Sequence, residues 1–123
     1  MIEIFDLLKD AAMGDFSKLH KLNWQEIDIN TKDEDGHTIL YYAAKTGQLD
    51  IVKHLRKEGA DFEFLTNQGC SVLHIAALHN NHSKVVEYLI NEKLVNINAQ
   101  NNYGWTPLHC AAENGHLDTI KFL

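Results

Sequence analysis

Three groups of residues have side chains that could do chemistry. His109 and Cys110 are adjacent, and a histidine beside a thiol is the pair of residue types in a cysteine nucleophile with its general base. His79 and His82 have the i, i+3 spacing with which a single helix can present two metal ligands. The run Asp33-Glu34-Asp35 offers carboxylates to a divalent cation.

The surrounding sequence completes none of these groups. Successive residues on a helix do not face each other, so His109 and Cys110 lack the geometry of a catalytic pair. The two other histidines straddle a predicted loop and have no third ligand, and the acidic run lacks the internal glycine of a calcium loop. The sequence contains no glycine-rich phosphate loop and no nucleophile elbow. We therefore predict no catalytic residue, no cofactor, no metal site and a chain that is not an enzyme.

The stretch from Gly104 to Ala112 is better explained as a structural unit. Gly104 can take the positive φ that ends a tight turn, and the Thr106 hydroxyl can cap a helix. Pro107 suits the first helical position because it needs no hydrogen-bond donor there. An apolar stripe follows, formed by Leu108, Ala111 and Ala112. So short a helix cannot bury its apolar face alone.

This unit recurs along the chain. Equivalent stretches begin at Gly36 and Gly69, so the three starts are separated by 33 and 35 residues. The glycine, the capping hydroxyl, the leucine and the paired alanines are present in all three, and a second short helical pattern follows each. A first copy without this box covers residues 3–31. We predict one domain of four repeats: repeat one (1–32), repeat two (33–65), repeat three (66–100) and an incomplete repeat four (101–123).

The period, the Gly-x-Thr-Pro-Leu-His-x-Ala-Ala box and the run from Asn96 to Gly104 resemble the ankyrin repeat family. The resemblance covers nearly the whole chain. It implies an all-α solenoid, in which paired antiparallel helices stack and a β-hairpin finger projects between successive repeats. It also implies that His74 and His109 each tie their helix to a neighbouring hairpin.

The apolar stripes of the repeats form the predicted core. Its inner-helix members are Leu7, Leu8, Ala11, Leu40, Ala43, Ala44, Leu73, Ala76, Ala77, Leu108, Ala111 and Ala112. Leu19, Leu22, Ile51, Val52, Leu55, Val85, Val86, Leu89 and Ile120 are predicted to back them. Leu123 closes the chain inside the second helix of repeat four, without a polar capping repeat. We therefore expect this chain to be either the N-terminal piece of a longer protein or a deliberately trimmed form.

Composition restricts the class of partner. A formal charge of −6 argues against nucleic acid and against an anionic membrane, which both attract clustered Lys and Arg. Residues 1–65 hold 13 acids and 8 bases, which favours a basic contact on that half. Cys70 and Cys110 form no disulfide or zinc framework, and residues 1–10 form no signal peptide or membrane anchor. We expect a monomer in the reducing cytoplasm.

The resemblance implies that recognition uses the finger tips and the inner-helix face, which stacking leaves free. Mapped onto this chain, these positions give the candidate partner-binding residues Asp35, His37, Lys45, Gln68, Cys70, Leu78, His79, Asn102, Tyr103, Trp105, Glu113 and Asn114. Trp105 has two interpretations, a binding anchor or a ring packed over a Lys or Gln stem of the neighbouring finger. The predicted function is a protein–protein interaction module, a scaffold or adaptor that binds another protein.

Two alternatives stay open. The module could be the substrate-targeting arm of a longer enzyme whose catalytic domain lies beyond residue 123, such as a secreted bacterial effector in the host-cell cytosol. Asn30 and Asn98 also resemble sites of asparaginyl hydroxylation in eukaryotic ankyrin repeats.

The predicted register of the repeats can be tested by three substitutions. Leu73→Ala should cost ~2 to 5 kcal/mol through lost burial and a cavity. Ala76→Leu should cost ~1 to 3 kcal/mol through overpacking, and Thr106→Ala about 1 kcal/mol through loss of a cap. Denaturant unfolding measures all three, and three unchanged midpoints would show that the register is wrong.

Overall fold

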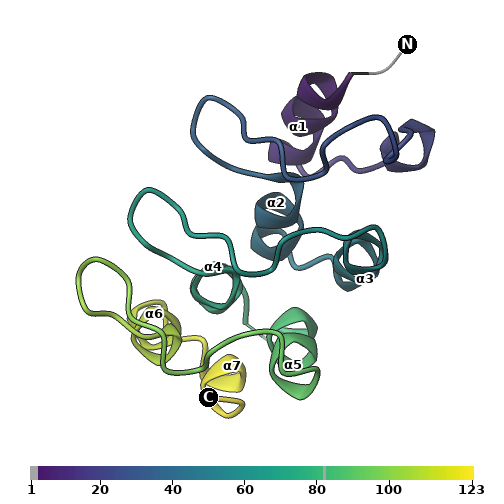
Figure 1. Ribbon diagram of the computed structural model, residues 1–123. Helices are drawn as coiled ribbons and strands as arrows, with labels where there is room; N and C mark the ends of the chain where they lie inside the picture. Colours follow the sequence, from purple (N-terminus) through teal and green to yellow (C-terminus); the bar gives the residue numbers. More distant parts are fainter. Residues whose placement is uncertain (1–2, 82) are drawn as a thin grey trace.

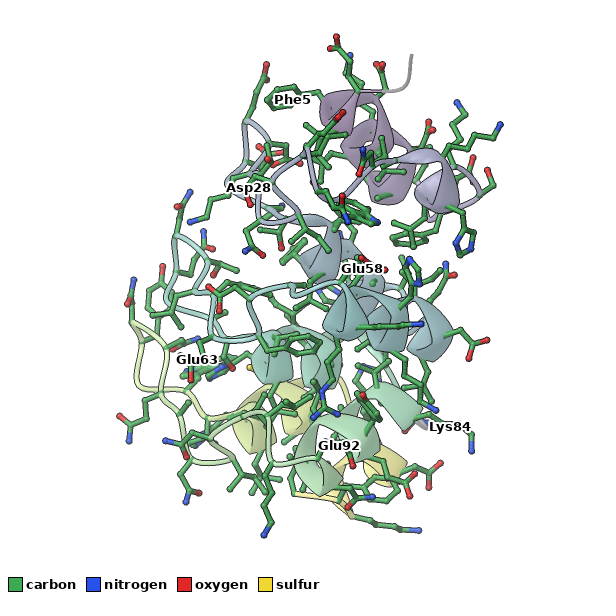
Figure 2. The ribbon with its side chains drawn as sticks, turned by 45° about the vertical axis from the view of Figure 1, so that its right-hand side comes forward. Phe5, Asp28, Glu58, Glu63, Lys84 and Glu92 are labelled. Atoms are coloured by element: carbon green, nitrogen blue, oxygen red, sulfur yellow. The ribbon has the colours of Figure 1, made fainter. Side chains whose placement is uncertain are left out.

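Seven α-helices and one 3-10 helix occur within residues 3–81 and 83–123, the part of the chain that the computed structural model describes. The inner row of helices consists of α1 (Ile4–Ala12), α2 (Ile39–Lys45), α4 (Val72–His79) and α6 (Pro107–Glu113). The outer row consists of η1 (Leu19–Lys21), α3 (Leu49–Lys57), α5 (Lys84–Asn91) and α7 (Leu117–Ile120). Figure 1 shows the two rows side by side, with loops projecting from the inner row, and Figure 2 shows the same stack with its side chains, turned by 45°. The predicted all-α solenoid is confirmed.

The outer element of repeat one is shorter than predicted. Its backbone N–H groups at Leu19 and Lys21 donate to the carbonyls of Phe16 and Lys18, three residues back. This bonding pattern defines a 3-10 turn, which rarely extends beyond one turn. Repeat one therefore pairs an α-helix with the 3-10 helix η1, and only repeats two to four contain two α-helices.

The inner helices α2, α4 and α6 begin as the sequence predicts. The hydroxyls of Thr38, Ser71 and Thr106 accept the N–H of the third residue of the helix, at 3.2, 3.3 and 3.4 Å. Pro107 occupies the first position of α6. Each cap satisfies a donor that the first turn of a helix leaves unpaired.

The fingers are tight loops, and no strand is assigned among the residues that the structure describes. Each tip is closed by a backbone bond from its first residue to the carbonyl of its fifth. These bonds run from Asp33 to His37 (3.0 Å), from Thr66 to Cys70 (2.9 Å) and from Asn101 to Trp105 (2.9 Å). We name these loops fingers two, three and four after their repeats.

The predicted core is largely confirmed, with two corrections. The inner-helix stripes of repeats one to three are buried, as are Ala111 and most outer-row members, while Ile51 and Ile120 are half-buried. Leu108 is 43% exposed although its counterpart Leu73 is fully buried, and Ala112 is exposed as well. In repeats two and three this stripe faces the next repeat. Among the described residues no helix packs beyond repeat four, so the equivalent stripe there meets solvent.

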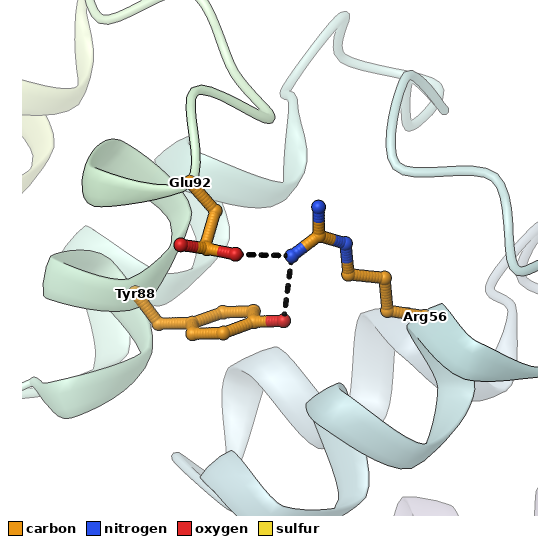
Figure 3. Close-up of polar contacts among 3 residues, drawn as sticks. All are labelled: Arg56, Tyr88 and Glu92. Atoms are coloured by element: carbon orange, nitrogen blue, oxygen red, sulfur yellow. Dashed lines mark hydrogen bonds and ion pairs between the residues drawn. The ribbon is translucent and has the colours of Figure 1, made fainter.

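A polar contact joins the outer helices of repeats two and three. Nη1 of the Arg56 guanidinium donates to the Tyr88 hydroxyl at 3.0 Å and to the Glu92 carboxylate at 2.6 Å (Figure 3). These bonds raise the pKa of Arg56 further above its ordinary value. Because the pair is exposed, it fixes the register of α3 against α5 more than it adds stability.

His74 ties repeat three to finger four. Its Nδ1 accepts the backbone N–H of Ser71 at 3.1 Å, so the ring proton is on Nε2, which donates to the Trp105 carbonyl at 2.7 Å. Burial lowers the pKa of His74, although its bonds to the carbonyls of Trp105 and Ala99 oppose the shift. The structural role that the family resemblance implies for this histidine is thus observed.

Asn80 replaces the helix-ending glycine that repeat three lacks. Its side-chain amide donates to the carbonyl of Ala76 in its own helix at 3.0 Å and to that of Ala44 in α2 at 2.9 Å. A Cβ on Gly47, where φ is +71°, would lie only 2.6 Å from the Asn80 Oδ1. Glycine at position 47 therefore permits one asparagine to cap two helices of neighbouring repeats.

Acid should destabilise the protein through His74. The unfolded chain takes up a proton near pH 6.5 but the folded chain resists it, so this contribution is complete above that pH and declines below it. Urea midpoints between pH 7.5 and 5.5 should fall less steeply for His74→Asn than for the unsubstituted chain.

His109→Asn is the matched control for this measurement, because it removes the equivalent histidine from the exposed copy of the box. An NMR titration of the His74 ring in the unsubstituted chain checks the same claim without a variant. A midpoint at or above the ordinary histidine value would contradict it.

Asn80→Asp should destabilise the fold by about 1 to 3 kcal/mol, because a carboxylate would face two carbonyls in place of a donor. Asn23→Asp is the control, since within residues 3–81 and 83–123 the Asn23 side chain uses only its Oδ1, to accept the Gln25 N–H, and aspartate keeps that acceptor. Equal urea midpoints for the two variants would show that the double cap contributes nothing.

Candidate functional site

A groove of about 520 Å³ lies between fingers and inner helices of repeats two, three and four. We call it the finger groove. Its floor is mainly apolar, and polar side chains stand at its mouth. The lining residues are His37, Tyr41, Thr66, Gln68, Cys70, Ile75, Leu78, His79, Asn101, Tyr103, Trp105, Cys110 and Glu113.

Eight of the twelve candidate partner-binding residues line this groove, namely His37, Gln68, Cys70, Leu78, His79, Tyr103, Trp105 and Glu113. The other four lie outside the lining. Asp35 and Lys45 are exposed. Asn102 and Asn114 take part in stacking, because their side-chain amides donate to the carbonyls of Asn67 at 3.2 Å and Leu78 at 2.7 Å.

Close packing of fingers three and four depends on Gly69, whose φ is +75°. A Cβ at this position would clash with the Asn102 side chain. The Asn102 backbone N–H also donates to the Gln68 carbonyl at 2.9 Å. These contacts align the two finger tips that border the groove.

Sequence reasoning missed residues on the groove floor. Tyr41, Ile75 and Cys110 are buried there, and none was among the candidates. Ile75 and Cys110 share the one position of the Leu-His-x-Ala-Ala box that differs in every repeat. That variability is the signal that could have identified them, because a position used only for stacking would favour the same residue in each repeat.

Trp105 is fixed by its backbone. Its N–H donates to the Asn101 Oδ1 at 3.0 Å, and its carbonyl accepts the bond from His74. The indole ring is 38% exposed and lies 6.5 Å from the His109 ring, while the neighbouring Tyr103 is 73% exposed. These backbone bonds, and not packing of the ring, hold Trp105 at the groove. They are compatible both with a binding anchor and with a ring packed on the neighbouring finger.

Asp33 holds finger two in place. Its Oδ1 accepts the backbone N–H groups of Asp35 and His37, both at 3.0 Å, and its Oδ2 accepts the Tyr42 hydroxyl. Burial alone would raise the pKa of Asp33, but these hydrogen bonds outweigh it, so the pKa lies below its ordinary value. The Tyr42 pKa is raised by burial and by the same bond.

A cation site at this finger was tested against the geometry. One ligand atom each from Asp33, Asp35 and His37 lies within 4.8 Å of the others. Both Asp33 oxygens, however, already accept hydrogen bonds from the finger and from Tyr42. We therefore assign Asp33 to the structure of the finger and propose no metal there. The histidine pair considered above includes His82, which lies outside the described residues.

His37 continues the groove wall from finger two. Its ring stacks on that of Tyr41, with centroids 3.7 Å apart and planes 8° apart. Burial lowers the pKa of His37, against opposing charges on Asp33 and Asp35. Near neutral pH this wall therefore presents uncharged aromatic surface.

His109 and Cys110 lie in different surroundings, as successive helical positions predict. His109 is exposed and its Nδ1 accepts the Thr106 N–H at 3.0 Å, whereas Cys110 is buried in the groove floor. Burial, together with the nearby Cys70 and Glu113, raises the pKa of the Cys110 thiol to about 11. A protonated thiol is a poor nucleophile, so the groove is better suited to binding than to catalysis.

Within the described part of the chain, no helix has both the length and the apolar composition needed to cross a bilayer.

The chain is similar to known proteins along almost its whole length. The family model described as "Ankyrin repeats (3 copies)" matches residues 7–101 and 55–123. An ankyrin repeat protein of Rickettsia felis is 33% identical over 119 residues, which cover 96% of this chain and 39% of that protein. The tyrosine-protein kinase Shark of Drosophila melanogaster is 32% identical over 125 residues, covering 98% of this chain and 13% of the kinase. The RelA-associated inhibitor of Mus musculus is 40% identical over 74 residues, covering 60% of this chain and 9% of the inhibitor.

The matched region makes up 39% of the Rickettsia felis protein and 9% of the RelA-associated inhibitor. They are matches of a repeat module within longer proteins. The recurring box, the stacked helices with their fingers and the family model all agree, and the chain belongs to the ankyrin repeat family.

Proposed function

We propose that this chain is an interaction module that binds a partner protein through its finger groove and the adjoining finger tips. Ankyrin repeats mediate protein–protein interactions, and domains built from them are typically non-enzymatic. The observation that carries the proposal is that residues shared by the repeats and residues that differ between them have different roles. The residues shared by the repeats, such as Thr38, Ser71 and Thr106, cap the helices or form the core. Residues that differ between repeats, such as Ile75 and Cys110, line one groove across three repeats.

The proposed module acts as a monomer and has no nucleic-acid or membrane partner. Its net charge of −6 supports this, since a nucleic-acid backbone or an anionic bilayer would repel it. Both cysteines are free thiols, which supports placement in the reducing cytoplasm.

A second candidate is the substrate-targeting arm of a longer enzyme. It is favoured by the similarity to Shark and by a match to the tyrosine-protein kinase HTK16 of Hydra vulgaris, 30% identical over 97 residues. In this case the groove would select the protein that a separate catalytic domain modifies. Assaying the natural full-length protein for phosphoryl transfer, with and without groove substitutions, tests this candidate.

The binding role of the groove can be tested with Tyr103→Ala combined with Trp105→Ala. Loss of two exposed aromatic rings should weaken capture of a partner by about tenfold or more, because such rings are common hot spots. The matched control combines Leu117→Ala with Phe122→Ala, which removes exposed apolar side chains that do not line the groove.

Both double variants are immobilised beside the unsubstituted chain, and bound proteins are quantified from the same extract after circular dichroism has confirmed equal helix content. Equal capture by the Tyr103 and Trp105 variant and by the unsubstituted chain would defeat the assignment of the binding site.

A further inference from the structure

We propose that the finger groove binds an extended segment of the partner that carries one apolar anchor residue and a lysine or arginine about three residues away. This inference rests on the proposed function and names the chemistry of its ligand. The anchor occupies the groove floor at repeat three, where Ile75 and Leu78 lie between Tyr41 and Cys110. The basic residue lies towards finger two.

The floor favours an apolar side chain. Tyr41, Ile75 and Cys110 are buried at its base, and Leu78 adds a half-buried aliphatic wall. Both ionisable groups there are neutral near pH 7, since burial raises the pKa values of Tyr41 and Cys110. A charged side chain placed on this floor would lose hydration without gaining a counter-ion. The volume of about 520 Å³ lies within the ~300 to 1,000 Å³ typical of pockets that enclose ligands.

The rim favours a positive charge. The exposed Glu113 lines the groove, and the exposed Asp35 of finger two has a carboxylate oxygen within 4.8 Å of a ring nitrogen of His37 in the groove wall. Lys45 is the opposing charge, since it acts on His37 and His79. Among the described residues, the ion pairs involve Asp10, Glu92 and Asp118, and neither Asp35 nor Glu113 forms one. These two carboxylates are therefore available to a partner's cation.

The stacking geometry fixes the spacing. Helices that pack against each other lie ~8 to 10 Å apart, so one repeat step separates the anchor site from finger two by roughly that distance. An extended chain advances ~3.3 Å per residue, which places the basic residue about three positions from the anchor. The exposed side chains of Gln68 and His79 at the groove mouth can bond the backbone between them.

The experiment uses a phage library of random dodecapeptides, selected on the immobilised 123-residue chain, followed by fluorescence anisotropy with the enriched peptides. Enriched sequences should share an aliphatic or aromatic residue and a Lys or Arg about three positions away. Replacing the anchor by serine should weaken binding about tenfold or more, and replacing the base by glutamate about two- to fivefold or more.

Variants of the protein test the same contacts. Leu78→Glu should weaken the selected peptides about tenfold or more, whereas Leu117→Glu, on an exposed leucine outside the groove, should not. Asp35→Asn with Glu113→Gln should weaken them about two- to fivefold and reduce the salt dependence. Glu26→Gln with Glu63→Gln is the charge-matched control, because both residues are exposed and lie outside the groove lining. If Leu78→Glu loses helix content, Leu78→Ala and the anchor-to-serine peptides give the same comparison.

Acidic or anchor-free peptides, peptides insensitive to Leu78→Glu, or the absence of any enriched peptide would each overturn this inference. The proposed function fails separately. If peptides are not enriched but the Tyr103 and Trp105 double variant loses a captured protein, the groove binds a folded surface and only the extended-segment inference is wrong. If neither assay responds to groove substitutions, the assignment of the groove is wrong as well.

Discussion

The constraint on which this structure depends is that a pair of two-turn helices cannot bury its own apolar face. Leu73 and Ala77 are fully buried where repeat four covers them, while Leu108 and Ala112 at the same positions of repeat four are exposed. Stability in such a stack is a sum of nearest-neighbour interfaces. The hydrogen bonds that cross between repeats, from His74 and from Asn80, follow from the same need, because they fix the orientation in which each interface forms.

The sequence predicts the scaffold well because each scaffold residue has a local job. Thr38, Ser71 and Thr106 each cap a helix through a contact with a residue three positions away. The recurring box therefore identifies α2, α4 and α6 without any knowledge of the tertiary structure. Two features were out of reach. The exposure of Leu108 depends on what lies beyond it, and the double cap by Asn80 depends on which carbonyls of another helix come within range.

The candidate site could be predicted only in part, for a related reason. Finger-tip residues such as Tyr103 follow from the position of the turn glycine, but the groove floor is made by side chains from different repeats. Tyr41 occupies the histidine position of the box, and in the structure it stacks on His37 and lines the groove. The residue that departs from the repeat pattern is the one that connects the scaffold to the binding surface.

The bond from His74 to the Trp105 carbonyl has one more consequence. The Trp105 backbone carries the indole ring at the groove mouth, and its carbonyl accepts a hydrogen bond from His74 Nε2–H that opposes the lowering of the His74 pKa. Two equilibria that share one structural element are linked reciprocally. A partner that strengthens this bond by holding finger four in place would make His74 easier to protonate, and proton uptake by His74 would tighten that partner's binding by the same factor. Partner binding at finger four and proton uptake by His74 are thus linked by a single coupling free energy.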